Sequence, residues 1–468
     1  MSTPTQRAID AIWRIESARL IAGLTRVVRD VSVAEDLAQD ALVAALEQWP
    51  RSGVPDNPGA WLMTTAKRRA IDALRRRVVL ERKEELMGRE QQILQQLEQA
   101  DLAAHVDEVQ DDILRLVFMT CHPVLSREAR VALTLRLLGG LSTPEIARAF
   151  LVPEGTIAQR IVRAKRTLSE SRVPFEVPGR GDLVERLAGV LEVIYLIFNE
   201  GYAATSGEHW TRPWLCADAL RLGRILAGLL PREPEVHGLL ALMELQASRL
   251  RARVGERGEP LRLAEQDRTR WDRLLVQRGL AGLQRAEELS RGLGPYTLQA
   301  AIAACHARAR SLEHTDWPRI VALYDALAAL SGSPVVELNR AVAVAMAFGP
   351  EAGLEIVDAL ADEPRLRRYH LLPSVRGDLL VRLGRLPEAR QEFTHAAELC
   401  DNARERELLL SRARACGPGE RPASMGVEPA TQYQGAGENH QQCHCSEDHP
   451  RAVRYGPASP ASQGGEEQ

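Results

Sequence analysis

The stretch from Ser142 to Leu168 carries the side chains best suited to contact another molecule. It is typical of a helix, a tight turn at Val152–Gly155 and a second helix, with Ser142 and Glu145 forming a capping box at the start. On the second helix, apolar residues recur at helical spacing and predict the buried face: Ile157, Ile161, Ala164 and Leu168. The opposite face carries hydrogen-bond donors suited to phosphates and base edges in a major groove: Thr156, Gln159, Arg160, Arg163 and Arg166. This pattern favours a DNA-reading helix-turn-helix over an ordinary helical hairpin with a basic face.

Other reactive side chains show no spacing that would support catalysis. Near the apolar segment that follows residue 183, the polar residues are scattered: Glu192, Glu200, His209 and Asp218. The seven cysteines form no disulfide or zinc-finger framework, which fits a reducing compartment. Cys121 and His122 lack a third ligand nearby, so we expect them to serve packing. We therefore predict no catalytic residue, no cofactor and no functional metal site.

One further cluster of metal-ligating side chains lies near the C-terminus: His440, Cys443, His444, Cys445 and His449. The segment from 417 to 468 around it is rich in Gly, Pro, Ser, Gln and Glu, so we predict that it is disordered. Short clusters of this kind bind metals adventitiously more often than by function. The cluster is therefore left out of the predicted sites.

Composition indicates an all-α protein of several domains. A chain of 468 residues has room for two or three domains, each with its own core. Aromatic residues make up only 4%, and no run of alternating β-branched residues bounded by turns is present. The longest apolar runs are far short of the roughly 20 residues that span a bilayer. We expect a soluble cytoplasmic protein with no membrane partner.

Three predicted helices occupy the N-terminal part. The first covers residues 7–30, and Ser32 with Glu35 predicts a second capping box that opens a helix running through Trp49. The first turns of that helix carry an acidic strip, which by itself is more often a solvated helix start: Glu35, Asp36, Gln39 and Asp40. A turn-rich loop at Pro50–Gly59 precedes the third helix. On that helix arginines repeat seven residues apart (Arg68 with Arg75, Arg69 with Arg76), a band suited to phosphates.

These motifs together resemble the sigma-70-like initiation factors of RNA polymerase, of the extracytoplasmic-function type. The acidic strip AEDLAQDAL, the Trp-ended helix, the Pro-rich loop and WLMTTAKRRAIDALRR resemble region 2 of that family. The segment EGTIAQRIVRAKRTL resembles region 4, and the order and separation of the two regions also match. The resemblance places region 2 (a helical bundle) at 7–80, a linker at 81–110 and region 4 at 111–172.

The resemblance also implies what each region binds. In the family the acidic strip docks on the clamp helices of the polymerase beta-prime subunit, and region 4 contacts the beta flap. The polymerase-binding residues implied here are Asp36, Gln39 and Asp40. The loop before the third helix captures an unpaired base of the −10 element, and the basic helix meets the −10 duplex, which implies Trp61, Lys67, Arg68 and Arg75. The second region-4 helix reads the −35 element, which implies Thr156, Gln159, Arg160, Arg163 and Arg166.

The C-terminal half predicts further helical hairpins from 183 to 415. Breaks fall at residues 199–201, 231–234, 255–260, 292–295 and 332–334. Near the end, small and packing residues fall at the positions of a tetratricopeptide repeat: Gly377, Gly384, Ala389, Phe393 and Ala396. A weaker match precedes it at Ala352, Ile356, Ala359 and Pro364. We predict an α-solenoid-like domain with a concave binding surface.

This layout resembles the subgroup of such sigma factors that carries a helical-repeat extension, which is thought to regulate the factor. The sequence thus predicts a transcription factor without enzymatic activity, bound to core polymerase and promoter DNA. The extension would have a protein or small-molecule partner that the sequence does not identify. One alternative is a helix-turn-helix regulator that is not a sigma factor, with a repeat-type partner-binding domain, and it would bind DNA tightly without polymerase. The other is a repeat scaffold with an incidental helix-turn-helix, which would bind neither.

Overall fold

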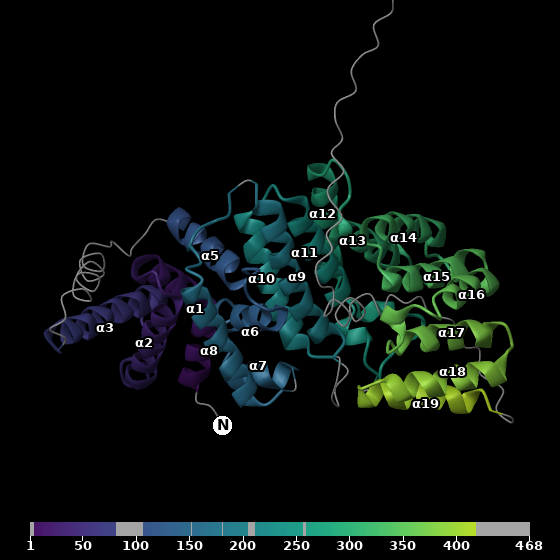
Figure 1. Ribbon diagram of the computed structural model, residues 1–468, viewed down its shortest axis with the longest axis horizontal. Helices are drawn as coiled ribbons and strands as arrows, with labels where there is room; N and C mark the ends of the chain where they lie inside the picture. Colours follow the sequence, from purple (N-terminus) through teal and green to yellow (C-terminus); the bar gives the residue numbers. More distant parts are fainter. Residues whose placement is uncertain are drawn as a thin grey trace, which may run out of the picture.

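The computed structural model describes residues 4–80, 106–150, 152–179, 181–204, 211–255 and 259–417. Within these ranges the protein is all-α, and its β-type pairing is limited to one isolated bridge between Val254 and Pro260. Figure 1 shows α1–α3 at one end of the long axis and α14–α19 at the other. The linker residues 81–105, His209 and the predicted tail with its His and Cys cluster (from residue 418) lie outside the described residues. None of the described helices is long and apolar enough to cross a membrane.

The first three helices form a bundle: α1 (Pro4–Val28), α2 (Val31–Ser52) and α3 (Pro58–Leu80). The buried Trp49 ring of α2 meets Trp61 of α3 edge-on, with ring centroids 5.2 Å apart, which joins the two helices. The predicted capping box at the start of α2 is wrong. Asp30 is the N-cap, and its carboxylate accepts hydrogen bonds from the backbone N–H groups of Ser32 and Val33 at 2.8 and 3.2 Å. The Glu35 side chain is instead engaged by residues far along the chain.

The loop between α2 and α3 is shorter than the sequence predicts. Helix α2 continues through Pro50 to Ser52, and Gly53 ends it with φ +83°. Helix α3 already begins at Pro58, a residue type that suits a first helical turn because its missing N–H would have no partner there. The side chain of Asn57 accepts a hydrogen bond from the backbone of Ala60 at 3.1 Å. Only residues 53–57 of the predicted loop are therefore non-helical.

Four helices form the region around the helix-turn-helix: α5 (Val106–Thr120), α6 (Arg127–Leu137), α7 (Thr143–Phe150) and α8 (Glu154–Glu170). The predicted capping box of α7 is confirmed. The Ser142 N–H donates to Glu145 at 2.8 Å, and the Glu145 N–H donates to the Ser142 hydroxyl at 3.4 Å. Before it, the chain turns at Gly140 with φ +69°, a conformation that favours glycine. The four predicted apolar residues are the buried residues of α8, which begins two residues before Thr156.

The described part of the extension contains these α-helices: α9 (Leu183–Tyr202), α10 (Pro213–Leu229), α11 (Pro234–Ala247), α12 (Arg273–Leu289), α13 (Pro295–Arg308), α14 (Trp317–Ser331), α15 (Pro334–Phe348), α16 (Pro350–Ala359), α17 (Leu371–Arg382), α18 (Leu386–Leu399) and α19 (Ala403–Ala415). The predicted break at residues 199–201 is wrong, because α9 continues to Tyr202. Gly201 serves close packing instead, since a Cβ there would lie 2.6 Å from the backbone nitrogen of Cys216 in α10. The other predicted breaks fall between helices.

The last hairpin packs as the repeat pattern predicts. Gly377 of α17 faces the ring of Phe393 in α18, and a Cβ at Gly377 would come within 2.8 Å of that ring. Ala389 and Ala396 are fully buried. In α16 the buried residues are Gly353, Leu354 and Val357, whereas the predicted Ala352 and Ile356 are half-buried and Ala359 is exposed. Ile356 packs against the core cluster of this end, whereas Ala359 does not face it, so the tetratricopeptide assignment stays a prediction.

One hydrophobic core runs through the sigma-like half and into the extension. It includes buried residues of α1, α2, α5, α6, α8, α9, α10 and α11 in a single cluster. A second cluster joins α15 to α19, and a third joins α13 to α15. Helices α9 and α10 pack directly on α5 and α6, so the extension completes the core of the region that precedes it.

Candidate nucleic-acid and polymerase interface

The donor face of α8 points away from the core. Thr156, Gln159, Arg163 and Arg166 are exposed, and Arg160 is half-buried. The buried stripe on the other side anchors the helix against α6 and α7, so these donors are presented on a fixed surface. Arg166 is partly engaged already, because its Nε donates to Glu170 at 2.6 Å.

Sequence reasoning missed one residue on this face. Val162 is 64% exposed, and it lies three residues after Gln159 and four before Arg166, on the same side of the helix. An exposed branched apolar side chain among donors is suited to the methyl group of a thymine. The unbroken run Ile161–Val162 in the sequence concealed it, because periodicity assigns only one of two adjacent apolar residues to the core.

The basic helix α3 lies beside the acidic strip of α2. Arg68 is exposed, whereas Lys67 and Trp61 are half-buried, and part of the Trp61 ring packs on Trp49. The side chain of Arg75 lies outside the described residues. Arg69 of α3 reaches Asp40 of α2 at 3.9 Å, so one cation of the basic helix is paired with the acidic strip.

The acidic strip divides into exposed and buried members. Asp36 and Asp40 are exposed and Gln39 is half-buried, but Glu35 is only 3% exposed and lies in the core. Partial burial raises the pKa of the Asp36 carboxyl, Lys165 opposes this shift, and the neighbouring Glu35 and Asp40 carboxylates add to it. Of the acidic strip, Asp36, Gln39 and Asp40 are therefore the members that reach the surface.

Glu35 joins region 2 to region 4. One carboxylate oxygen accepts a hydrogen bond from Arg136 Nε of α6 at 2.6 Å, and the other is paired with the ammonium of Lys165 on α8. Both cations come from helices more than 100 residues away along the chain, so no local pattern could have indicated the contact.

A second ion pair links the two regions at 2.8 Å between Arg14 of α1 and Glu145 of α7. Burial alone would raise the pKa of Glu145, but the hydrogen bonds from Ser142 and the charge of Arg14 together lower it. The Glu145 carboxylate thus caps α7 and also forms an ion pair that connects region 4 to region 2.

Cations of the extension hold the ends of the region-4 helices. Arg221 of α10 donates to the backbone oxygens of Leu138 and Gly139, both at 3.1 Å, just after α6. Arg186 of α9 donates to Phe118 O at 2.9 Å in the last turn of α5. These carbonyls carry the negative end of each helix dipole, so guanidinium groups are stabilising there.

The scattered polar residues of the extension form separate ion pairs. Glu192 contacts Arg127 and Arg130 at 3.1 and 3.8 Å, Glu200 pairs with Arg212, and Asp218 lies 3.9 Å from Arg221. The structure therefore does not bring them together. Cys121 is buried, with its sulfur 3.5 Å from the Thr134 hydroxyl, and burial raises the pKa of its thiol, which fits the predicted packing role.

Three stretches of the chain match known protein families. The family described as "Sigma-70 region 2" matches residues 14–78, and "Sigma-70, region 4" matches residues 115–168. Residues 186–287, which include most of α9, all of α10 and α11 and most of α12, match a "Family of unknown function (DUF6596)". No solved structure matches the chain.

Several curated relatives are similar over different lengths. "Uncharacterized protein R00370" of Rhizobium meliloti is 44% identical over 389 residues, which is 82% of this chain and 90% of that protein. "Probable ECF RNA polymerase sigma factor SigI" of Mycobacterium tuberculosis is 27% identical over 38% of this chain and 60% of its own length. "ECF RNA polymerase sigma factor SigK" of Mycobacterium sp. (strain KMS) is 28% identical over 33% of this chain and 77% of its own length. The chain belongs to the family of sigma-70-like RNA polymerase sigma factors of the extracytoplasmic-function type, in the form that carries an extra C-terminal helical domain.

Proposed function

We propose that this protein directs bacterial core RNA polymerase to promoters, reading the −35 element with α8 and engaging the −10 element with α3 and residues 53–57. The observation that supports this most directly is the α8 donor face, where four of the five donor residues are exposed and Arg160 is half-buried, while the opposite face is buried. Asp36, Gln39 and Asp40 would dock on the beta-prime clamp helices, and region 4 on the beta flap. The protein would have no catalytic activity of its own and would work where the polymerase is, in the cytoplasm.

We further propose that the extension modulates this activity by holding region 4 against region 2. Two arginines of the extension bind region 4: Arg221 contacts the end of α6, and Arg186 contacts the end of α5. Two ion pairs then connect region 4 to region 2, one between Arg136 of α6 and Glu35 of α2, the other between Glu145 of α7 and Arg14 of α1. Lys165 points toward Glu35 at the acidic strip, so docking of polymerase on that strip would disturb the contact. A partner that binds the extension would shift the equilibrium between an arrangement in which region 4 is held against region 2 and one in which the two regions are apart.

The −35 assignment is tested on α8. Arg163→Ala should weaken binding to a preferred site by about 1–3 kcal/mol if the guanidinium reads a base edge, and should relax the preference at that base. Arg148→Ala is the matched control, because Arg148 is an exposed arginine on α7 of the same helix-turn-helix. Equal losses by Arg163→Ala on all DNA sequences would reassign this side chain to phosphate contact.

The function as a whole is tested by in vitro transcription with purified full-length protein, bacterial core polymerase and a pool of promoters. Specific transcripts would support the proposal, and a polymerase pull-down separates a silent sigma factor from a DNA-binding regulator. The role of the extension is better tested by Arg221→Ala than by truncation at residue 183, because truncation would expose the apolar surfaces of α5 and α6 that α9 and α10 cover. Unchanged transcription by Arg221→Ala would count against the modulating role of this contact.

A further inference from the structure

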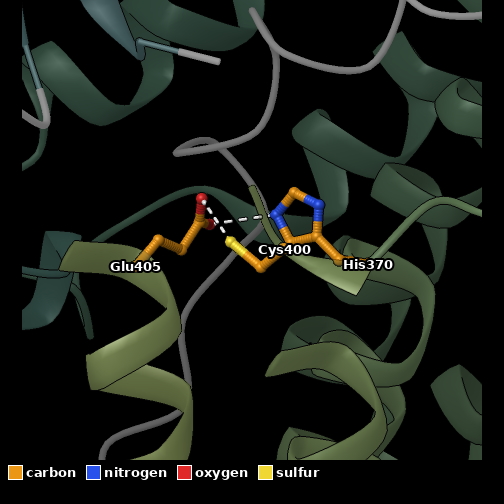
Figure 2. Close-up of side chains that lie close together, drawn as sticks. All are labelled: His370, Cys400 and Glu405. Atoms are coloured by element: carbon orange, nitrogen blue, oxygen red, sulfur yellow. Dashed lines mark hydrogen bonds and ion pairs between the residues drawn. The ribbon is translucent and has the colours of Figure 1, made fainter. Parts of the chain in front are cut away.

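Three metal-ligating side chains converge near the end of the extension (Figure 2). His370 directly precedes α17, Cys400 directly follows α18, and Glu405 lies in the first turn of α19. His370 Nε2 lies 3.2 Å from one Glu405 carboxylate oxygen, and Cys400 Sγ lies 3.6 Å from the other. One ligand atom from each residue lies within 4.8 Å of the others. The cluster thus joins three consecutive helices at a single point.

These separations are close to those of a tetrahedral zinc site. With Zn–N and Zn–O distances of about 2.1 Å and a Zn–S distance of about 2.3 Å, two ligand atoms of a tetrahedron lie roughly 3.4–3.6 Å apart. The N–O distance of 3.2 Å and the S–O distance of 3.6 Å run to different oxygens of the Glu405 carboxylate. Because one ligand atom from each residue lies within 4.8 Å of the others, a small movement of the side chains on metal binding would bring them to this spacing. A histidine nitrogen, a thiolate and a carboxylate are also the donor types that Zn²⁺ combines.

The surroundings hold this geometry in place. Cys400 is 1% exposed, and the buried Nε2 of His370 makes no hydrogen bond although it faces a carboxylate oxygen. The Asn402 side chain caps α19 by accepting a hydrogen bond from the backbone N–H of Glu405 at 3.2 Å, which fixes the position of the Glu405 backbone. The same side chain donates to Ala204 O, just after α9, at 3.1 Å. Arg406 donates to the Cys400 carbonyl oxygen and does not contact the sulfur through this bond. The Cys400 thiol lies 3.6 Å from both Asn402 O and a Glu405 oxygen.

We propose that His370, Cys400 and Glu405 form a binding site for one Zn²⁺ ion, with the fourth position open to a water molecule. The ion would connect α17, α18 and α19, and through Asn402 it would stabilise the contact between this end of the extension and the residues that follow α9. Without metal, His370 Nε2 faces one Glu405 oxygen at 3.2 Å, and the Cys400 thiol donates to the other at 3.6 Å.

The test uses the full-length chain with His440, Cys443, His444, Cys445 and His449 replaced by serine, so that these residues cannot contribute. Zn²⁺ binding is measured by competition with a chromophoric chelator, and Co²⁺ is used as a spectroscopic probe. We expect one equivalent of Zn²⁺, and with Co²⁺ a thiolate-to-metal charge-transfer band. Cys400→Ser should abolish the band, and both Cys400→Ser and His370→Gln should weaken Zn²⁺ binding at least about tenfold.

Matched controls are present in the same part of the extension. Cys416→Ser removes another buried cysteine of the same core cluster, and His395→Gln removes an exposed histidine of α18. Both should leave the band and the affinity within about twofold of the parent. The parent protein is the full-length chain with the five tail replacements, and the band is measured on it first. If circular dichroism shows that Cys400→Ser does not fold, the band of the parent protein still tests the proposal. Absence of the band from the parent, or equal losses in the control variants, would overturn the proposal.

Discussion

The contact that depends most on a single carboxylate is that of Glu35 with Arg136 and Lys165. Glu35→Gln keeps the shape of the side chain and an acceptor for Arg136, but it removes the charge that Lys165 neutralises. Breaking a buried ion pair costs about 3–5 kcal/mol. The side chains of Arg136 and Lys165 are 20% and 14% exposed, so both cations can regain part of their hydration. We therefore expect a loss of about 2 kcal/mol in the stability of the contact between the two regions.

A loss of about 2 kcal/mol would raise the equilibrium constant for separation of region 4 from region 2 by about 30-fold, because 1.36 kcal/mol corresponds to a factor of ten. Hydrogen exchange of the amides of α6 and α8 should rise by that factor, while exchange in α17 and α18 should stay unchanged. Glu47→Gln is the matched control, since Glu47 is an exposed carboxylate of the same helix. A rise of less than about threefold in α8, or an equal effect of Glu47→Gln, would refute the idea that Glu35 holds the regions together.

Three further predictions concern single side chains. Asp36→Arg should lower affinity for core polymerase in a pull-down while binding of a −35 duplex is kept; unchanged polymerase affinity would contradict the docking role. The hydrogen bonds from Ser142 and the charge of Arg14 lower the folded-state pKa of Glu145, so these interactions stabilise the fold above the ordinary carboxyl value of 4.5 and are lost as the pH falls through the lowered pKa. The destabilisation caused by Glu145→Gln at neutral pH should therefore vanish at the acid end of a pH–stability profile. Gly201→Ala should lower the free energy of unfolding by about 1–3 kcal/mol through its clash with α10, whereas Gly228→Ala, with open space around it, should be neutral or stabilising; equal effects of the two would argue against the close packing.

The local features of the site were within reach of sequence reasoning because they depend on periodicity and short-range hydrogen bonds. The buried stripe of α8 and the Ser142–Glu145 capping box follow from residues three and four apart, and both are observed. The same logic failed at Ser32 and Glu35, where the capping pattern is present but a more distant interaction uses the carboxylate. Asp30, two residues before Ser32, then supplies the cap.

The extension shows the same division. Breaks at Gly and Pro and the close packing of Gly377 on Phe393 can be read from composition and spacing. The continuity of α9 through Gly201 cannot, because whether a glycine ends a helix or admits a neighbouring backbone depends on what packs against it.

The sequence by itself therefore determined the all-α class, the order of the two sigma regions and the donor face of α8, since each is written in residues close together along the chain. Only the tertiary structure decided that Glu35 is buried between Arg136 and Lys165, and that α9 and α10 share a core with α5 and α6. It also brought His370, Cys400 and Glu405 to one point from three helices. Charge pairing and burial between distant segments depend on how helices pack, and helix packing is not encoded in any local period.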